Sequence, residues 1–161
     1  MLSAMRPQRF LYDLSDCPIA TALDVLGEKW TLLILREAIY GVRRFDDFAE
    51  ALSCGRGVLS ARLKTLCEAG VMERRDYAEP GQRRRAEYRL TAMGRDLFPA
   101  LLAISQWSER WMPPPAGPVA HVRERVSGQP VRVVMTSEAE VRPLTLGELD
   151  ITPGPGAVRL A

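Results

Sequence analysis

The spacing of apolar residues changes from helical to strand-like near residue 70, and this change limits the possible folds most. Segments with helical spacing come first, at about residues 17–26, 28–39, 45–52 and 57–68. Strand-like segments follow at residues 71–77 and 86–90, and a turn that contains Pro80 and Gly81 separates them. The sequence therefore predicts a mainly α fold with a small β-hairpin, in the α+β class.

A proline-rich stretch is expected to divide the chain. A long helix is predicted from Thr91 to about Met112, and Pro99 either kinks this helix or marks its true start. Residues 113–118 are Pro-Pro-Pro-Ala-Gly-Pro, which is typical of a stiff linker. We therefore expect one domain at residues 1–112 and a small β-rich C-terminal extension at residues 119–161. Within the extension, strands are predicted at residues 121–126 and 131–136, and a loop at residues 152–156.

The composition excludes several classes of function. The 161-residue chain is 47% hydrophobic and can bury a core, but it has no apolar run long enough to cross a bilayer and no signal-peptide pattern. Its three cysteines are widely spaced and it has one histidine, so no disulfide or metal-ligand pattern is present. It also lacks a nucleophile–base pair and a phosphate-binding glycine loop. We therefore expect a cytoplasmic protein that is not an enzyme and needs no metal or cofactor.

The segment at residues 57–68 has two chemically different faces. Leu59, Leu63 and Leu66 share one face, which is expected to enter the core. The opposite face carries small or basic residues, namely Gly57, Ser60, Ala61 and Lys64. Because small side chains let a helix backbone approach the major groove of DNA closely, we predict a winged helix-turn-helix with this segment as its recognition helix.

The predicted hairpin, or wing, carries a concentration of positive charge. Residues 53–90 contain nine Lys or Arg and five Asp or Glu, so this stretch has a charge of +4. Arg83, Arg84 and Arg85 lie at the turn, where a cationic tip suits DNA phosphates or a narrow minor groove. Two interpretations follow: a wing that contacts DNA, or a small helical domain with a solvated charged hairpin.

Several motifs, taken together, resemble the HxlR-type winged helix-turn-helix regulators. They include Leu26-Gly27-Glu28-Lys29-Trp30, Arg44-Phe45-Asp46-Asp47-Phe48 and Glu87-Tyr88-Arg89-Leu90-Thr91. The resemblance covers about residues 17–111, and it implies a homodimeric transcription regulator whose partners are double-stranded operator DNA and a second copy of the chain. It also implies that the N-terminal segment and the long helix form the dimer interface, here with Tyr12, Leu97, Leu101, Ile104, Trp107 and Trp111.

The sequence departs from the family pattern just before the predicted recognition helix. The family usually has Ser-Pro-Arg there, whereas this chain has Gly55-Arg56-Gly57. Arg56 is therefore the candidate basic contact at this end of the helix. Lys29 matches a basic residue of the family and is either a phosphate contact or an ordinary surface lysine. The departure supports an alternative function, that of a small-molecule-responsive or protein-interaction regulator whose DNA binding is weak or lost.

Cys17 is the candidate sensor of oxidants or electrophiles. The resemblance implies this role, because a cysteine at this position serves as the reactive thiol in several HxlR-type regulators. The positive end of the helix dipole stabilises a thiolate in the first turn, whereas the carboxylate of Asp16, the expected N-cap, opposes it. The other interpretation is a structural thiol packed in the core.

Aromatic residues near the long helix have two interpretations. Phe98, Trp107, Trp111 and Tyr12 either line a cavity for a small-molecule effector or form the core of a dimer. Helical spacing of aromatic residues favours the dimer core. The C-terminal extension resembles one that carries cysteine pairs in some family members. Since these cysteines are missing here, no zinc site is expected.

Overall fold

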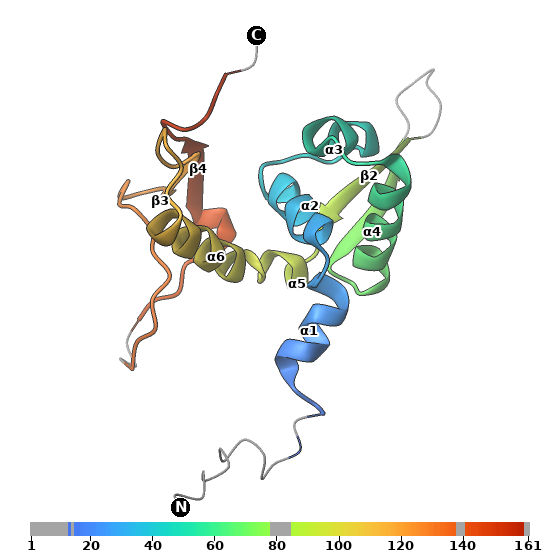
Figure 1. Cartoon of the computed structure of the whole chain (residues 1–161), viewed down its shortest axis with the longest axis horizontal. Helices are drawn as coiled ribbons and strands as arrows, with labels where there is room; N and C mark the ends of the chain where they lie inside the picture. The colour runs from blue at the N-terminus through green and yellow to red at the C-terminus, as the bar shows by residue number, and fades with distance from the viewer. Residues whose placement is uncertain (1–12, 14, 78–84, 138–140, 160–161) are drawn as a thin grey trace, which may run out of the picture.

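The computed structural model describes residues 13, 15–77, 85–137 and 141–159. Their helices and strands form two groups, which the chain connects between α5 and α6 (Figure 1). The first group contains α1 (Pro18–Leu26), α2 (Lys29–Ile39), α3 (Phe45–Leu52), α4 (Arg56–Glu68), β1 (Met72–Tyr77), β2 (Arg85–Leu90) and α5 (Ala92–Arg95). The second contains α6 (Phe98–Trp111), β3 (Ala120–Glu124), a 3₁₀ turn at Leu146–Glu148 and β4 (Leu149–Pro153). The predicted α+β class, with a winged helix-turn-helix and a β-containing extension, is confirmed.

The main core lies between α2, α3 and α4, and β1 and β2 border it. Leu59, Leu63 and Leu66 of α4 are fully buried, as their helical spacing predicted. They pack with Ile34 of α2 and Phe48 of α3 in one cluster. Because this leucine stripe anchors α4, the opposite face of the helix is turned to solvent.

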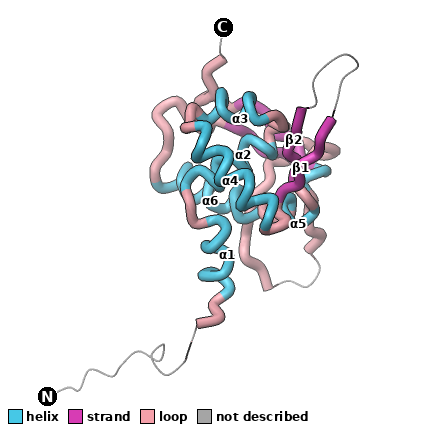
Figure 2. The backbone as a smooth tube through the Cα atoms, turned by 90° about the vertical axis from the view of Figure 1, so that its right-hand side faces the viewer, coloured by secondary structure: helices cyan, strands magenta, loops and turns pink. Residues whose placement is uncertain are grey.

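The β1–β2 hairpin forms the wing beside this core (Figure 2). The strands pair antiparallel, with Met72 opposite Leu90 at the base. The backbone N–H of Tyr88 donates to the carbonyl oxygen of Arg43 at 2.8 Å. The chain that leads into α3 is therefore tied to the wing, which fixes the wing relative to the helices. The predicted turn at residues 78–84 lies outside the described residues.

The long helix predicted after Thr91 is in fact two helices. The backbone N–H of Gly94 donates to the hydroxyl oxygen of Thr91 at 3.2 Å and caps the short helix α5. Pro99 lies in the first turn of α6, where its missing N–H is tolerated. Of the two predicted alternatives, Pro99 therefore marks the true start of the long helix, and the kink within a helix that begins after Thr91 is wrong.

The C-terminal appendage (residues 119–161) packs on α6 through a second cluster of buried residues. Phe98 and Leu102 of α6 meet Leu149 of β4 in this cluster. β3 pairs antiparallel with β4, with Val122 opposite Ile151. The division of the chain at residues 113–118 stays a prediction, and the appendage contacts the end of the preceding segment directly.

Two predictions for the appendage are wrong. Residues 131–136 form no strand, and β4, the partner of β3, includes residues 152–153, which were expected in a loop. Only an isolated bridge joins Arg123 to Pro130. Proline has no N–H with which to extend that pairing. The N–H of Val131 still donates to the carbonyl oxygen of Val122, but the side chain of Gln106 binds the carbonyl oxygen of Val131 and the N–H of Val133.

Helix α1 differs from the other helices of the first group because it has no buried residue. Asp16 was expected as its N-cap, but the N-cap is Cys17, and no side chain caps the helix. Ile19 and Leu23, four residues apart, are 71% and 56% exposed. Figures 1 and 2 show α1 projecting away from the other elements. Helical spacing correctly predicted the helix. Val25 and Leu26 at its end pack against the main core, but Ile19 and Leu23 find no cover within the described part of the chain.

Candidate nucleic-acid interface

The outer face of α4 is exposed, and after Arg56 its first positions carry small or apolar side chains. Gly57, Ser60, Ala61 and Lys64 are all exposed, opposite the buried leucine stripe. No atom lies within 4 Å of the position that a Cβ on Gly57 would take. Val58, which was not among the predicted site residues, is also exposed. It offers an apolar contact of the kind that suits the methyl group of thymine. Its place directly after Gly57 was the available indication.

Arg56 lies at the first residue of α4 but contacts α3. Its Nη2 atom donates to Oδ1 of Asp46 at 2.9 Å, and its guanidinium carbon lies 4.7 Å from the ring centroid of Phe45. Arg56 and Asp46 are both largely exposed, so this ion pair contributes little stability. Arg56 can therefore release Asp46 and bind another anion in its place. The contact of Asp46 with Arg56 is not predictable from the sequence, because no local pattern relates residues ten positions apart.

The two candidate lysines have different surroundings. Lys64 lies on the outer face of α4, with its Nζ atom 3.7 Å from Oε1 of Glu68 one turn later. Lys29 begins α2, with its Nζ atom 5.2 Å from the ring centroid of Trp30. Lys29 lines a cleft beside α6, which none of the candidate α4 residues lines. The structure thus brings Lys64 together with Arg56 on one helix and leaves Lys29 on another surface.

The arginines on the wing strands are paired with acidic neighbours. Three ion pairs join residues two positions apart: Arg74–Asp76 at 3.3 Å, Arg75–Glu73 at 2.6 Å and Arg89–Glu87 at 2.7 Å. Arg85 is exposed at the first residue of β2, and Arg83 and Arg84 lie outside the described residues. The charge of the strands is therefore balanced locally, and residues 83–85 remain the candidate cationic contact of the wing.

The three cysteines occupy different environments. Cys17 is half-buried beside a surface depression of about 380 Å³ that Asp13 and Asp16 also line. Cys54 is half-buried in the turn before α4. Cys67 lies near the end of α4, where burial raises the pKa of its thiol. A raised pKa keeps a thiol protonated, so Cys67 is poorly suited to react with oxidants.

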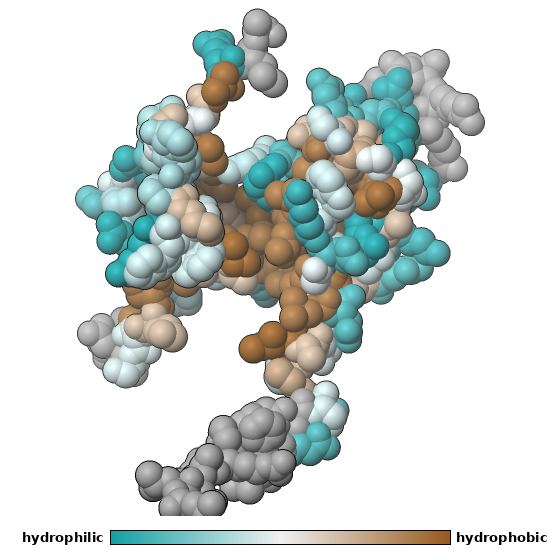
Figure 3. All heavy atoms as spheres, in the orientation of Figure 1, coloured by the Kyte–Doolittle hydropathy of each residue, from teal (hydrophilic) through white to brown (hydrophobic). Residues whose placement is uncertain are grey.

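Apolar side chains are exposed along α6. Ile104, Trp107 and Trp111 are each more than half exposed, whereas Leu97 and Leu101 are half-buried against the main core. Tyr12 lies outside the described residues. Figure 3 shows hydrophobic residues between the two groups of elements, and this hydrophobic surface continues onto α1. Of the residues expected in a dimer interface, the structure thus leaves three uncovered on one helix.

Residues 13, 15–77, 85–137 and 141–159 lack two further features. These ranges contain no helix with the length and apolar character needed to cross a membrane. They also contain no group of three or more His, Cys, Asp or Glu side chains placed to hold a metal ion.

Comparison with known proteins identifies relatives of the whole arrangement. Residues 25–116 match the family described as HxlR-like helix-turn-helix. The uncharacterised HTH-type transcriptional regulator Rv3095 of Mycobacterium tuberculosis is 41% identical over 140 residues, which are 86% of each chain. The crystal structure of PA1607, a candidate transcription factor, has a TM-score of 0.67 and 38% identity, and covers 86% of this chain and 95% of its own. The redox regulator HypR in its reduced form has a TM-score of 0.52 and 32% identity, over 58% of this chain and 91% of its own.

Proposed function

Because the chain belongs to the HxlR-like helix-turn-helix family of DNA-binding transcription regulators, we propose that it acts as a homodimer on a roughly palindromic operator. The observation that carries this proposal is the exposed outer face of α4, where small and cationic side chains lie opposite a buried leucine stripe. Such a face suits a recognition helix that enters the major groove. In a twofold dimer, two α4 helices would enter successive major grooves about 34 Å apart, and the two wings would contact the flanking backbone.

Exposed apolar side chains on two helices support the dimer. Ile104, Trp107 and Trp111 of α6 and Ile19 and Leu23 of α1 are all more than half exposed. Large side chains of this kind, gathered on one surface, mark a protein–protein interface more often than a solvated surface. A second copy of the chain is the partner that family membership favours.

The proposal is tested by replacing Lys64 with alanine. DNA fragments from upstream of the protein's own gene and its neighbours are titrated in gel-shift assays. The wild-type chain is expected to bind at least one fragment specifically. The Lys64→Ala variant is expected to lose about 1–3 kcal/mol of specific binding free energy if Lys64 contacts a base. A uniform loss across sequences, with a salt slope lower by about one unit, would indicate a phosphate contact instead.

Arg159→Ala is the matched control, since it also removes one positive charge but lies near the C-terminus, far along the chain from α4. Equal losses for both variants, or none for either, would contradict the docking of α4. If the wild-type chain binds none of the fragments above the background of non-specific DNA, the alternative function as a regulator that acts through protein contacts takes its place.

Replacing Asp46 with asparagine is expected to raise DNA affinity. The carboxylate of Asp46 holds the guanidinium of Arg56 and lies where it would repel phosphate. Its removal frees Arg56 for the DNA backbone, and we expect about two- to fivefold tighter binding at low salt, the range typical of exposed charge pairs. Titration by fluorescence anisotropy at two salt concentrations measures this gain and its screening.

Asp47→Asn provides the control, because Asp47 lies in the same first turn of α3 and is also exposed. A gain of equal size in both variants would show that general charge, rather than the release of Arg56, sets the affinity. Arg56→Ala should abolish the gain from Asp46→Asn, because the two side chains act as a pair.

We also propose Cys17 as a thiol through which oxidants control DNA binding. The likeness to HypR, solved in reduced and oxidised forms, favours redox control in this chain. Cys17 is the N-cap of α1, whose apolar residues are exposed, so a change at Cys17 can alter how α1 packs. In this step peroxide oxidises the thiol to a sulfenic acid and is itself reduced to water.

Genomic footprinting with and without peroxide tests this control. Occupancy of the wild-type protein is expected to change after oxidation, and that of Cys17→Ser is expected to stay constant. Cys54→Ser should respond as the wild type does. Unchanged wild-type occupancy, or a Cys17→Ser variant that still responds, would assign Cys17 a structural role.

A further inference from the structure

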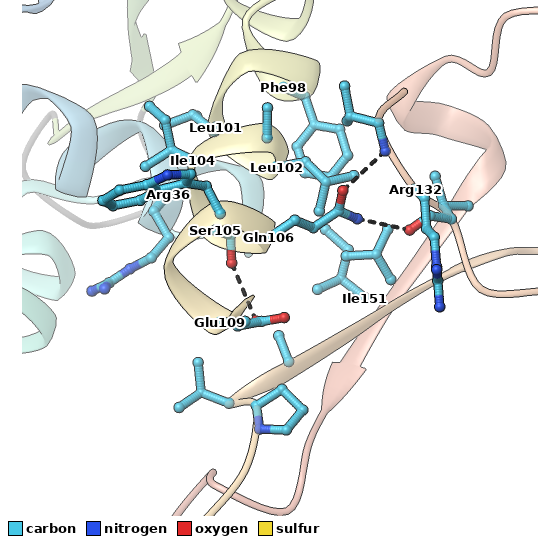
Figure 4. Close-up of a pocket in the computed structure, with 18 of the residues that line it drawn as sticks. Arg36, Phe98, Leu101, Leu102, Ile104, Ser105, Gln106, Glu109, Arg132 and Ile151 are labelled. Carbon is cyan, nitrogen blue, oxygen red and sulfur yellow. Dashed lines mark hydrogen bonds between the residues drawn. The ribbon is translucent and has the colours of Figure 1, made fainter. Parts of the chain in front are cut away.

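A deep cleft separates the winged helix-turn-helix from the C-terminal appendage. It has a volume of about 1430 Å³, and residues of α2, of α6 and of residues 130–135 line it. Figure 4 shows Leu101, Ile104 and Ser105 of α6 at this cleft, with Arg132 on the opposite side. Of the described residues, none in α1 of the same chain lines the cleft. Helix α1 of the same chain therefore does not fill this space.

The wall contributed by the appendage is an extended segment held at one end by α6. Nε2 of Gln106 donates to the carbonyl oxygen of Val131 at 2.9 Å, and the backbone N–H of Val133 donates to Oε1 of Gln106 at 2.9 Å (Figure 4). Val134 is 70% exposed and Met135 is fully exposed, and both line the cleft. Together with the hydrogen bond from the Val131 N–H to the carbonyl oxygen of Val122, the Gln106 amide fixes the direction of a segment in which Val134 and Met135 remain uncovered.

Helix α1 has the dimensions and the surface to fill this space. A helix of nine residues is about 13–14 Å long and, at about 10–12 Å across, occupies on the order of 1,000–1,500 Å³. Its apolar residues Ile19 and Leu23 lie on one face and are exposed. A helix this short is not stable by its own propensity and needs a packing partner.

The charges of the two surfaces are opposite. Residues 13–28 contain four Asp or Glu, of which Asp24 lies within α1 and the others flank it, and no Lys or Arg. The cleft is lined by Lys29, Arg36, Arg110 and Arg132 and by one carboxylate, Glu109. Arg36 is already paired with Glu37, which still leaves an excess of positive charge. Opposite potentials favour this pairing over the docking of a basic or neutral segment.

We propose that the appendage is part of the dimer interface, and that α1 of each copy lies in the cleft of the other between α6 and residues 131–135. This inference rests on the proposed dimer. It adds to the dimer interface a surface from outside the winged helix-turn-helix, namely residues 131–135 of the appendage. In a twofold dimer the cleft of each copy would receive α1 of the other, so both clefts would be filled and both α1 helices covered. The appendage then sets the strength of dimerisation, and through it the spacing of the two α4 helices.

The first experiment measures dimerisation of the full chain by sedimentation equilibrium. The double variant Val134→Asp/Met135→Asp is expected to raise the dimer dissociation constant about tenfold or more, because it places carboxylates against the apolar side chains of α1. Val126→Asp is the control, since Val126 is 92% exposed in the appendage but does not line the cleft. It should change the constant less than about twofold. A wild-type chain that stays monomeric would refute the dimer itself, whereas a wild-type dimer indifferent to the double variant would refute only the role of the appendage.

A mixing experiment tests whether α1 docks onto the other copy. Leu23→Asp in α1 and the double variant in the appendage each damage both contacts of a homodimer. In a mixed dimer, the unchanged α1 of one copy meets the unchanged cleft of the other, so one contact stays intact. The changed α1 meets the changed cleft in the other contact, where the second defect adds little to the first. The 1:1 mixture is therefore expected to contain more dimer than either variant alone.

No recovery on mixing would overturn the exchange of α1 between copies. Native mass spectrometry of the purified wild-type chain adds one further outcome. A small molecule that copurifies with it and is lost in the double variant would assign the cleft to a ligand, and the inference would be wrong.

Discussion

Replacing Arg83, Arg84 and Arg85 together with alanine is expected to weaken binding to every DNA sequence, specific and non-specific alike. Phosphate contacts release counterions, and each contributes about 0.9 to the slope of log affinity against log salt. Loss of the three contacts of one wing would therefore flatten the slope by up to about three units and lower affinity up to roughly 500-fold at about 0.1 M salt, and a dimer that engages both wings would lose up to about twice that slope. Fluorescence anisotropy with operator and unrelated DNA, each at four salt concentrations, measures both quantities.

The wing also supplies a control with the same change in charge. Arg74, Arg75 and Arg89 each pair with an acidic neighbour on the same strand. Their joint replacement by alanine removes three cations that are already balanced, so we expect the salt slope to change by less than about one unit. If the two triple variants flatten the slope equally, the turn has no special role and the wing contributes only diffuse charge.

The elements that could be predicted from sequence are those whose burial partners are close along the chain. The leucine stripe of α4 repeats at helical spacing and packs on the neighbouring α2 and α3, so periodicity alone located its buried face. In α1 the same periodicity located the apolar face but could not show whether this chain covers it. Ile19 and Leu23 remain exposed because their cover, by our inference, belongs to a second copy.

The appendage shows why local patterns fail for long-range pairing. Residues 131–136 and β4 both have strand-like composition, and adjacency favoured the first as the partner of β3. The chain instead pairs β3 with β4, and the glycines after β4 explain part of the choice. A Cβ on Gly154 or Gly156 would lie 2.2–2.3 Å from the carbonyl oxygens of residues 117–118, so both glycines permit a close backbone contact that no local motif reports.

The candidate interface was predictable in its residues but not in their pairing. The exposed positions on α4 follow directly from the position of its leucines. The contact of Arg56 with Asp46 depends instead on how α3 and α4 cross, which is a tertiary property. The same holds for the break between α5 and α6, where Pro99 allowed two interpretations and only packing distinguishes them.

Replacing Gly94 with alanine is expected to destabilise the winged helix-turn-helix more than a change elsewhere on its helices. Gly94 is buried in α5, and a Cβ there would lie 2.1 Å from the carbonyl oxygen of Val71 and 3.1 Å from Cδ2 of Leu90. Backbone must move to relieve the first of these contacts. We expect a loss of about 3 kcal/mol in the free energy of unfolding, at the upper end of the range for overpacking, measured by urea denaturation.

Gly57→Ala is the matched control for this variant, because it makes the same chemical change within a helix. No atom lies within 4 Å of the added Cβ at Gly57, and alanine favours a helix over glycine by about 1 kcal/mol, so this variant should be neutral or slightly more stable. Since α5 joins β2 to α6, displacement of Gly94 should also shift α6 relative to α4. DNA affinity of Gly94→Ala is therefore expected to fall even at temperatures where the variant is fully folded. Equal stabilities for the two variants would show that α5 does not pack on the start of β1 in solution, and the connection between wing and dimer helix would then be loose.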